Sequence, residues 1–154
     1  MAIYKLLEDV GDAAFALIAI HSQEEDYRLA YQINAAIATH FSHSSIVVEN
    51  HQQHRFNVYE WEDKHMEHTW YLVANIAVRE DVAKNAQSLF AEQGLLKAYL
   101  VPEMKKVDYF IKINNIDQFF TCSSLIEELM KVSGVVTAYE VDPHQLKSKN
   151  NLIF

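Results

Sequence analysis

Six polar and aromatic side chains in two short segments are the candidates for chemistry in this sequence. They are Asp26, Tyr27, Arg28, Glu103, Asp108 and Tyr109. Carboxylates and an arginine beside tyrosine rings can bind a charged ligand or a partner protein, and carboxylates can also act as general acids or bases. Because no nucleophile, metal pair or phosphate loop accompanies them, we predict a binding site here and assign no catalytic residue.

Most of these groups also have a structural explanation. Pro102 presets the first corner of a turn, and the short polar connection that follows it suits a tight link between antiparallel strands. Glu103 could accept backbone amides inside this turn, and Asp108 could pair with Arg28 or Lys112. A shared ligand or partner site is the alternative interpretation of the same residues.

Histidines form three His-x-x-His pairs in the middle of the chain. The pairs are His40 with His43, His51 with His54, and His65 with His68. Imidazoles in such clusters can bind zinc or copper. Two of the pairs fall in predicted strand connections, and no cysteine pair or His-Glu-x-x-His motif supports them. We therefore interpret them as solvated loop histidines and predict neither a metal nor another cofactor.

The single cysteine, Cys122, precedes a predicted helix, where the positive helix end could lower the pKa of its thiol. Nothing in the sequence fixes a base such as His21 or Asp26 beside it, so we interpret Cys122 as a buried or half-buried thiol. One cysteine cannot form an internal disulfide, which is typical of a cytoplasmic protein.

A β-α-β unit is predicted over residues 15–49, around the first candidate segment. Phe15–Ile20 is apolar on both alternating faces, which is typical of a strand covered on both sides. Ser22 and Glu25 match a capping box, so a helix is expected to begin there. Residues 45–49 are the expected returning strand.

A second unit of the same order is predicted over residues 109–141. A strand follows the proline turn, a capping box at Ser124 and Glu127 begins a helix, and Gly134 ends it before the closing strand. Right-handed crossovers would place both helices on one side. We therefore expect an α+β fold, an antiparallel or mixed sheet with helices mainly on one face, built from two ferredoxin-like or ACT-like β-α-β units.

Further elements are predicted between the two units. Residues 45–49, 55–61 and 69–78 are rich in β-branched and aromatic side chains and indicate three strands of an antiparallel meander, with a hairpin connection at residues 50–54 between the first two. Residues 81–93 indicate a helix that ends at Gly94, and residues 95–101 indicate the strand before the proline turn.

The whole chain, residues 1–154, has the size and apolar content of a single domain, since half of its residues are apolar and no linker-like tract divides it. The net charge of −8 disfavours nucleic-acid binding. The uncharged run Ala13–Ile20 is too short to span a membrane. Acidic Glu8 and Asp9 stand where a secretory signal carries basic residues, so we expect a cytoplasmic protein.

The tail Leu152–Phe154 is apolar and follows a polar tract. Chain ends are normally polar and frayed. We therefore expect this tail to pack into the protein's own core or across a dimer, with docking on a different protein as the alternative.

The segment Val101–Tyr109, VPEMKKVDY, resembles the signature after which the uncharacterised IPExxxVDY family is named, with Val101 in place of the first isoleucine. Other stretches that look like this family's pattern bring the resemblance to nearly the whole chain. They are residues 18–22, 26–30 with Asn34, 70–75, 138–142, 146–149 and 152–154. The resemblance implies a small cytoplasmic bacterial protein, chiefly from Bacteroidota, without an assigned activity, and it brings no catalytic residues.

These observations predict a non-enzymatic binding or protein-interaction module that forms a homo-oligomer or binds an unidentified protein partner. The alternative is a small enzyme with a carboxylate and arginine site near Arg28, Glu103 and Asp108, which requires these side chains to converge on one pocket. An RNA-facing sheet is a third class, and the negative charge disfavours it.

Overall fold

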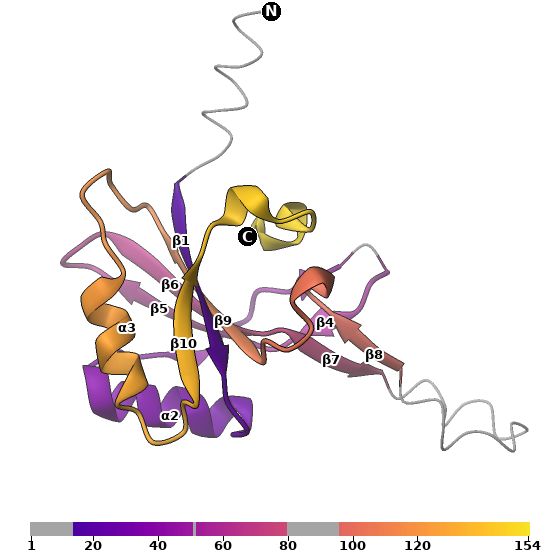
Figure 1. Ribbon diagram of the computed structural model, residues 1–154, viewed down its shortest axis with the longest axis horizontal. Coiled ribbons are helices and arrows are strands. Elements are labelled where there is room, and N and C mark those ends of the chain that lie inside the picture. Colours follow the sequence, from indigo (N-terminus) through magenta and orange to yellow (C-terminus); the bar gives the residue numbers. More distant parts are fainter. Residues whose placement is uncertain (1–13, 51, 80–95) are drawn as a thin grey trace, which may run out of the picture.

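The computed structural model describes residues 14–50, 52–79 and 96–154. Its centre is an antiparallel sheet of six strands (Figure 1). In sheet order the strands are β10 (Thr137–Val141), β1 (Phe15–His21), β9 (Tyr109–Asn114), β6 (His68–Ala74), β5 (Val58–Asp63) and β2 (Ser42–His43). Two α-helices, α2 (Asp26–Ile37) and α3 (Ser123–Met130), accompany the sheet, so the predicted α+β class is confirmed.

The two crossovers of the sheet are interleaved. β9, α3 and β10 form one of them, and β1 lies between its two strands. β1 and α2 begin the other, and the strand that runs parallel to β1 on the far side of β9 is β6. This is the split β-α-β arrangement of ferredoxin-like folds, in which neighbouring strands are antiparallel although each crossover joins parallel ones.

The predicted returning strand at residues 45–49 is wrong in position. That part of the chain ends in β3 (Val48–Glu49), which pairs with β4 (Arg55–Phe56). The predicted hairpin between these two runs is therefore confirmed, but it forms a separate two-stranded sheet. Asn50 holds the turn, because its Oδ1 accepts the backbone N–H of His54 at 3.1 Å. Local turn bonds thus form a hairpin here, and the crossover that begins at β1 is completed only by β6.

Two of the predicted strands are each divided by an asparagine. Asn57 separates β4 from β5, and Asn75 separates β6 from β7 (Ile76–Arg79). β7 pairs with β8 (Leu96–Tyr99) in a second small sheet. The predicted strand at residues 69–78 therefore serves two different sheets.

Both faces of the central sheet are covered. The two helices pack on one face, against Ile18, Ile20, Leu72, Ile111 and Ile113. The small sheets, the turn after β8 and the C-terminal segment cover the other face, against Leu17, Ala19, Tyr71, Val73 and Phe110. Because successive strand residues point to opposite faces, a strand in such a sheet is apolar throughout. The predicted cover of Phe15–Ile20 on both sides and the placement of the helices on one face are confirmed (Figure 1).

Both predicted capping boxes are wrong. α2 begins at Asp26, α3 begins at Ser123, and no side chain caps either helix. The buried hydroxyl of Ser22 instead accepts the N–H of Glu24 at 3.1 Å and donates to the carbonyl of Gly134 at 2.6 Å. A hydrogen bond between two distant loops thus replaces the local cap.

Gly134 has a different role from the predicted helix end, because α3 already ends at Met130. A Cβ on Gly134 would lie 1.9 Å from Oε1 of Gln32 and 2.8 Å from Cγ of Glu24. The missing side chain therefore allows the loop before β10 to approach α2 closely.

The predicted helix at residues 81–93 lies outside the residues that the structure describes. The longest described helix, α2, has 12 residues, and no helix in the described ranges is long and apolar enough to cross a membrane.

Candidate functional site

The proline turn between β8 and β9 is held in place by Asn75, which is fully buried. Its Nδ2 donates to the carbonyls of Met104 and Val107 at 3.0 and 2.8 Å, and its Oδ1 accepts the backbone N–H of Val101 at 2.8 Å. Buried backbone groups need such partners. Asn75 therefore positions the segment that precedes Asp108 and Tyr109.

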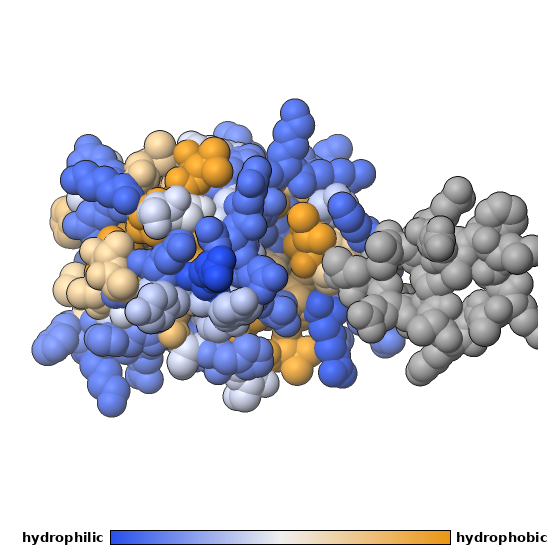
Figure 2. Space-filling model, turned by 90° about the horizontal axis from the view of Figure 1, so that it is seen from below, coloured by the Kyte–Doolittle hydropathy of each residue, from blue (hydrophilic) through white to orange (hydrophobic). Residues whose placement is uncertain are grey.

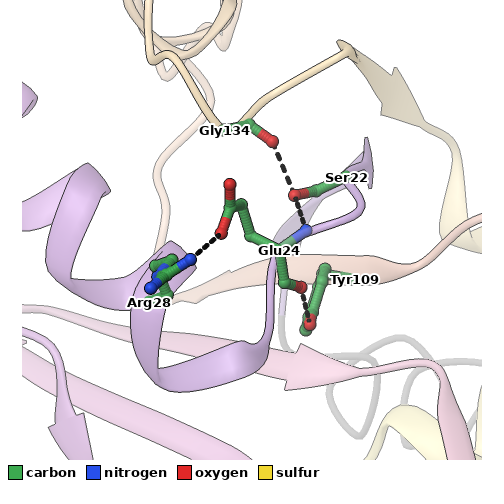
Figure 3. A network of polar contacts seen from close by, with 5 residues as sticks. All are labelled: Ser22, Glu24, Arg28, Tyr109 and Gly134. Atoms are coloured by element: carbon green, nitrogen blue, oxygen red, sulfur yellow. Dashed lines mark hydrogen bonds and ion pairs between the residues drawn. The ribbon is translucent and has the colours of Figure 1, made fainter.

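Asp108 and Tyr109 hold the loop between β1 and α2. Oδ2 of Asp108 accepts the backbone N–H of Ser22 at 2.8 Å. The hydroxyl of Tyr109 donates to the carbonyl of Glu24 at 2.6 Å (Figure 3). The predicted pairing of Asp108 with Arg28 or Lys112 is wrong. The reason is that β9 pairs directly with β1, which presents the Ser22 amide to the carboxylate.

The first turn of α2 carries the other early candidates. Oδ1 of Asp26 accepts the N–H of Tyr27 at 2.8 Å, and Oδ2 accepts Nδ2 of Asn57 at 2.8 Å. Arg28 lies 3.6 Å from the Glu24 carboxylate, in an exposed pair (Figure 3). Tyr27 is 57% exposed. Asp26 thus connects α2 to the residue between β4 and β5, while Tyr27 and Arg28 face solvent.

Carboxylates at the start of α2 and just before β9 lie around the phenol of Tyr109. Burial raises the pKa of Tyr109 strongly, and the charges of Asp26, Asp108 and Glu25 raise it further. Burial, followed by the charge of Asp26, also raises the pKa of Tyr59 on β5. The structure therefore brings the start of α2 and the start of β9 into one acidic neighbourhood with tyrosine rings.

Glu103 lies outside this neighbourhood. Its carboxylate accepts the backbone N–H of Ser148 at 3.1 Å and also the hydroxyl of the same serine. It borders a different cavity, together with Met104 and Tyr139. Of the six candidate residues, Asp26, Tyr27, Arg28, Asp108 and Tyr109 are therefore neighbours, and Glu103 anchors the C-terminal segment.

An open cavity of about 460 Å³ lies between the β1–α2 loop and β9. Its lining is formed by Ser22, Gln23, Glu24, Ala74, Ile76, Asp108 and Tyr109. Ala74 and Ile76 make an apolar wall, and Asp108 and Tyr109 make a polar one. Such a combination suits a molecule with an apolar stem and a polar or positively charged end.

The histidines are only partly where the sequence predicts them. His40, His43 and His65 are exposed, but His54 and His68 are buried, His68 against the ring of Phe120 at 5.4 Å. The prediction of solvated histidines is wrong for these two, because their rings pack on folded chain. Within residues 14–50, 52–79 and 96–154, no group of three or more His, Cys, Asp or Glu side chains is arranged to hold a metal ion.

Cys122 is buried, and this burial raises the pKa of its thiol to about 11, with a smaller contribution from Glu140. A thiol with a raised pKa is a poor nucleophile at neutral pH. The structure agrees with the interpretation of a buried thiol.

The C-terminal segment packs on the protein's own core. Leu152 is fully buried, and Nδ2 of Asn151 donates to the carbonyl of Leu100 at 2.8 Å. Nζ of the buried Lys112 donates to the main-chain oxygen of Phe154 at 2.6 Å and lies 4.2 Å from that ring and 4.8 Å from the ring of Phe15. Burial lowers the pKa of Lys112 to about 8. The first of the predicted positions for this tail is confirmed.

No protein-family model matches the chain, and no curated protein or solved structure matches it. The IPExxxVDY resemblance therefore stays a prediction. The fold and the site together define an α+β protein. In it, a proline turn and two strands hold the start of α2, a helix with one buried and one exposed face.

Two residues that hold the site, Asn75 and Ser22, have roles that the sequence pattern does not predict. Asn75 stands inside an otherwise apolar strand pattern, and a buried amide there is a signal of backbone contacts. Ser22 was assigned to a helix cap although it directly follows a core strand. Sequence spacing does not reveal the hydrogen-bond partners of either residue. Asn75 and Met104 are 29 residues apart, and Ser22 and Gly134 are 112 apart.

Proposed function

We propose that this chain is a small non-enzymatic binding module that docks a protein partner through the solvent face of α2. The observation that carries the proposal is the exposure of two tyrosines one helical turn apart, Tyr27 at 57% and Tyr31 at 73%. Arg28 lies between them with an exposed side chain. Tyrosine and arginine are enriched among the residues that dominate binding energy in protein interfaces.

The face of α2 opposite the tyrosines is the one that packs on the sheet. Leu29, Ala30 and Ile33 are buried against the sheet. Tyr27 and Tyr31 do not contribute to that core, so their rings are free to contact a partner protein. Figure 2, which views the molecule from the α2 side, shows a mainly hydrophilic face with separate apolar patches. A face of this kind suits a partner that binds reversibly.

The bonding of the candidate residues favours binding over catalysis. Asp26, Asp108 and Tyr109 each use a polar atom to hold this chain's own backbone or side chains. A general acid or base must reach the proton it transfers. The enzyme alternative also needs Glu103 beside Arg28 and Asp108, and the bond between Glu103 and Ser148 argues against that.

Two further parts of the proposal rest on the sequence. The single cysteine supports a cytoplasmic location. The VPEMKKVDY segment supports membership of the IPExxxVDY family of bacterial proteins.

Partner capture from native lysate tests the proposal. We expect the wild-type chain to retain a stoichiometric partner and the Tyr27→Ser/Tyr31→Ser variant to lose it, with both chains melting at the same temperature. Phe119→Ser is the matched control, because Phe119 is an aromatic side chain that is 80% exposed in the loop before α3. Equal retention in the double variant and the control contradicts the proposal, as does a wild-type chain that retains no protein partner.

A further inference from the structure

We propose that the partner which docks on α2 presents a basic segment, and that one of its lysine or arginine side chains enters the cavity between the β1–α2 loop and β9. This inference rests on the proposed function, since it names the chemistry of the partner for that same face. It is argued from charge, from the shape of the cavity and from the exposed tyrosine rings of α2.

Charge complementarity selects the occupant. Glu24 and Asp108 line the cavity, and the carboxylates of Glu25 and Asp26 lie close enough to act on Tyr109 in its wall. Arg28 pairs with Glu24 at 3.6 Å and offsets one of these four negative charges. The net charge of the chain is −8, so an acidic segment or a nucleic acid is repelled and a basic one is attracted.

The walls of the cavity suit a long side chain with a charged end. Ala74 and Ile76 offer apolar surface to an aliphatic stem, and Asp108 and Tyr109 lie at the polar wall. The Asp108 carboxylate accepts the Ser22 amide through Oδ2. A carboxylate has room for about four hydrogen bonds, so it can also bind an ammonium or guanidinium group.

The exposed tyrosines extend the same recognition along α2. A cation above the face of a tyrosine ring is attracted by the ring quadrupole. Tyr27 and Tyr31 are spaced by four residues and so lie on one side of the helix. A second basic residue of the partner can therefore pack on these rings while the first occupies the cavity.

Fluorescence anisotropy with the full chain tests the inference. The probe is a labelled, blocked peptide in which arginines alternate with alanines, compared with the same peptide carrying uncharged citrulline in place of arginine. We expect only the arginine peptide to bind, and its affinity to fall about tenfold between about 50 mM and about 300 mM salt, because exposed charges are screened.

Charge-neutral variants locate the binding site. Asp108→Asn keeps an oxygen that accepts the Ser22 amide, and Glu25→Gln is exposed, so both should fold as wild type. We expect Asp108→Asn, in the cavity wall, to weaken binding of the arginine peptide about fivefold, as for a directly paired charge, and Glu25→Gln, which is near the cavity but outside its lining, to weaken it about twofold. Glu127→Gln is the control, because it removes the same charge from an exposed position on α3 and should leave the affinity unchanged.

The outcomes separate this inference from the proposed function. Equal weakening by all three variants, or equal binding of both peptides, overturns the basic-partner inference. If the Tyr27→Ser/Tyr31→Ser variant loses its lysate partner while Asp108→Asn and Glu25→Gln retain it fully, the docking function stands and the inference falls. If the tyrosine variant retains its partner, the docking function falls first.

Discussion

At the scale of single residues, one buried amide organises the segment with the strongest sequence signature. The side chain of Asn75 makes three hydrogen bonds to backbone groups of the turn between β8 and β9. The turn supports the β1–α2 loop, since it leads into Asp108, which accepts the Ser22 amide. The conformation of the signature thus depends on a residue outside it.

Replacing Asn75 by alanine should destabilise the protein strongly. Two carbonyls and one N–H would lose their partner in a buried place, so we expect the free energy of unfolding to fall by about 3 kcal/mol. Urea unfolding followed by circular dichroism measures this change. Asn57→Ala is the control, since Asn57 is exposed and makes a single bond to Asp26. If Asn75→Ala lowered the free energy of unfolding by less than about 1 kcal/mol, the turn would be stable without the bonds from Asn75.

The hydroxyl of Tyr109 predicts a pH dependence of stability. Burial and nearby carboxylates raise its pKa above the ordinary value of 10.0. Above about pH 10 the unfolded chain releases the phenolic proton while the folded chain keeps it, so this stabilisation is complete below that pH and is lost as the pH rises.

Urea unfolding at a series of pH values between about 8 and about 11 checks this expectation. Tyr109→Phe should cost about 1 kcal/mol at neutral pH, from the lost bond to Glu24, and should reduce the loss of stability above pH 10. Tyr31→Phe should follow the wild type, because its ring is 73% exposed. Parallel pH curves for wild type and Tyr109→Phe would contradict the assignment.

At the scale of elements, the C-terminal segment behaves as part of the core that covers the sheet face opposite the helices. Leu152 contributes a fully buried side chain there, and the next residue, Ile153, is 73% exposed. The rings of Phe154 and Tyr71 lie 5.2 Å apart at a nearly perpendicular angle. The C-terminal segment thus covers the part of this sheet face that β3, β4 and β8 leave open.

The adjacent pair Leu152 and Ile153 gives a matched test of that packing. We expect Leu152→Ala to reduce the free energy of unfolding by about 3 kcal/mol, since a buried leucine leaves a cavity, and Ile153→Ala to change it by less than about 0.5 kcal/mol. Thermal melting and urea unfolding both report the difference. Similar small effects for the two variants would mean that the segment is not docked in solution.

At the scale of the whole molecule, the sheet is shared by two apolar layers. Leu17 and Ile18 are neighbours on β1, both fully buried, and they point to opposite layers. A change in one layer should therefore weaken the fold as a unit. This is testable because Trp70 lies in the layer on the helix side.

Leu17→Ala, on the face away from Trp70, should lower the unfolding midpoint seen by tryptophan fluorescence as much as the midpoint seen by circular dichroism. We expect a loss of about 3 kcal/mol in a single transition. Two separate transitions, with the fluorescence midpoint unchanged, would show that the layers unfold independently.

Residue patterns predicted the elements whose determinants are local. The apolar run at Phe15–Ile20 and the proline at 102 led to a correct strand and a correct turn, because pleat alternation and the fixed φ of proline act within a few residues. The start of α2 was misplaced, because Ser22 uses its hydroxyl for Gly134 instead of a cap. Five of the six candidate residues are neighbours in the structure. Glu103 is close to Asp108 in sequence, but its carboxylate binds Ser148 instead.

The sequence by itself determined the α+β class and the sides of the strands, since these follow from composition and from the two- and 3.6-residue periods. Only the tertiary structure decided that β6, not residues 45–49, completes the first crossover, and that Asn75 and Asp108 hold the helix start. These choices depend on contacts between residues far apart in the chain. Their energies arise only when the sheet has brought the partners together, so no local pattern records them.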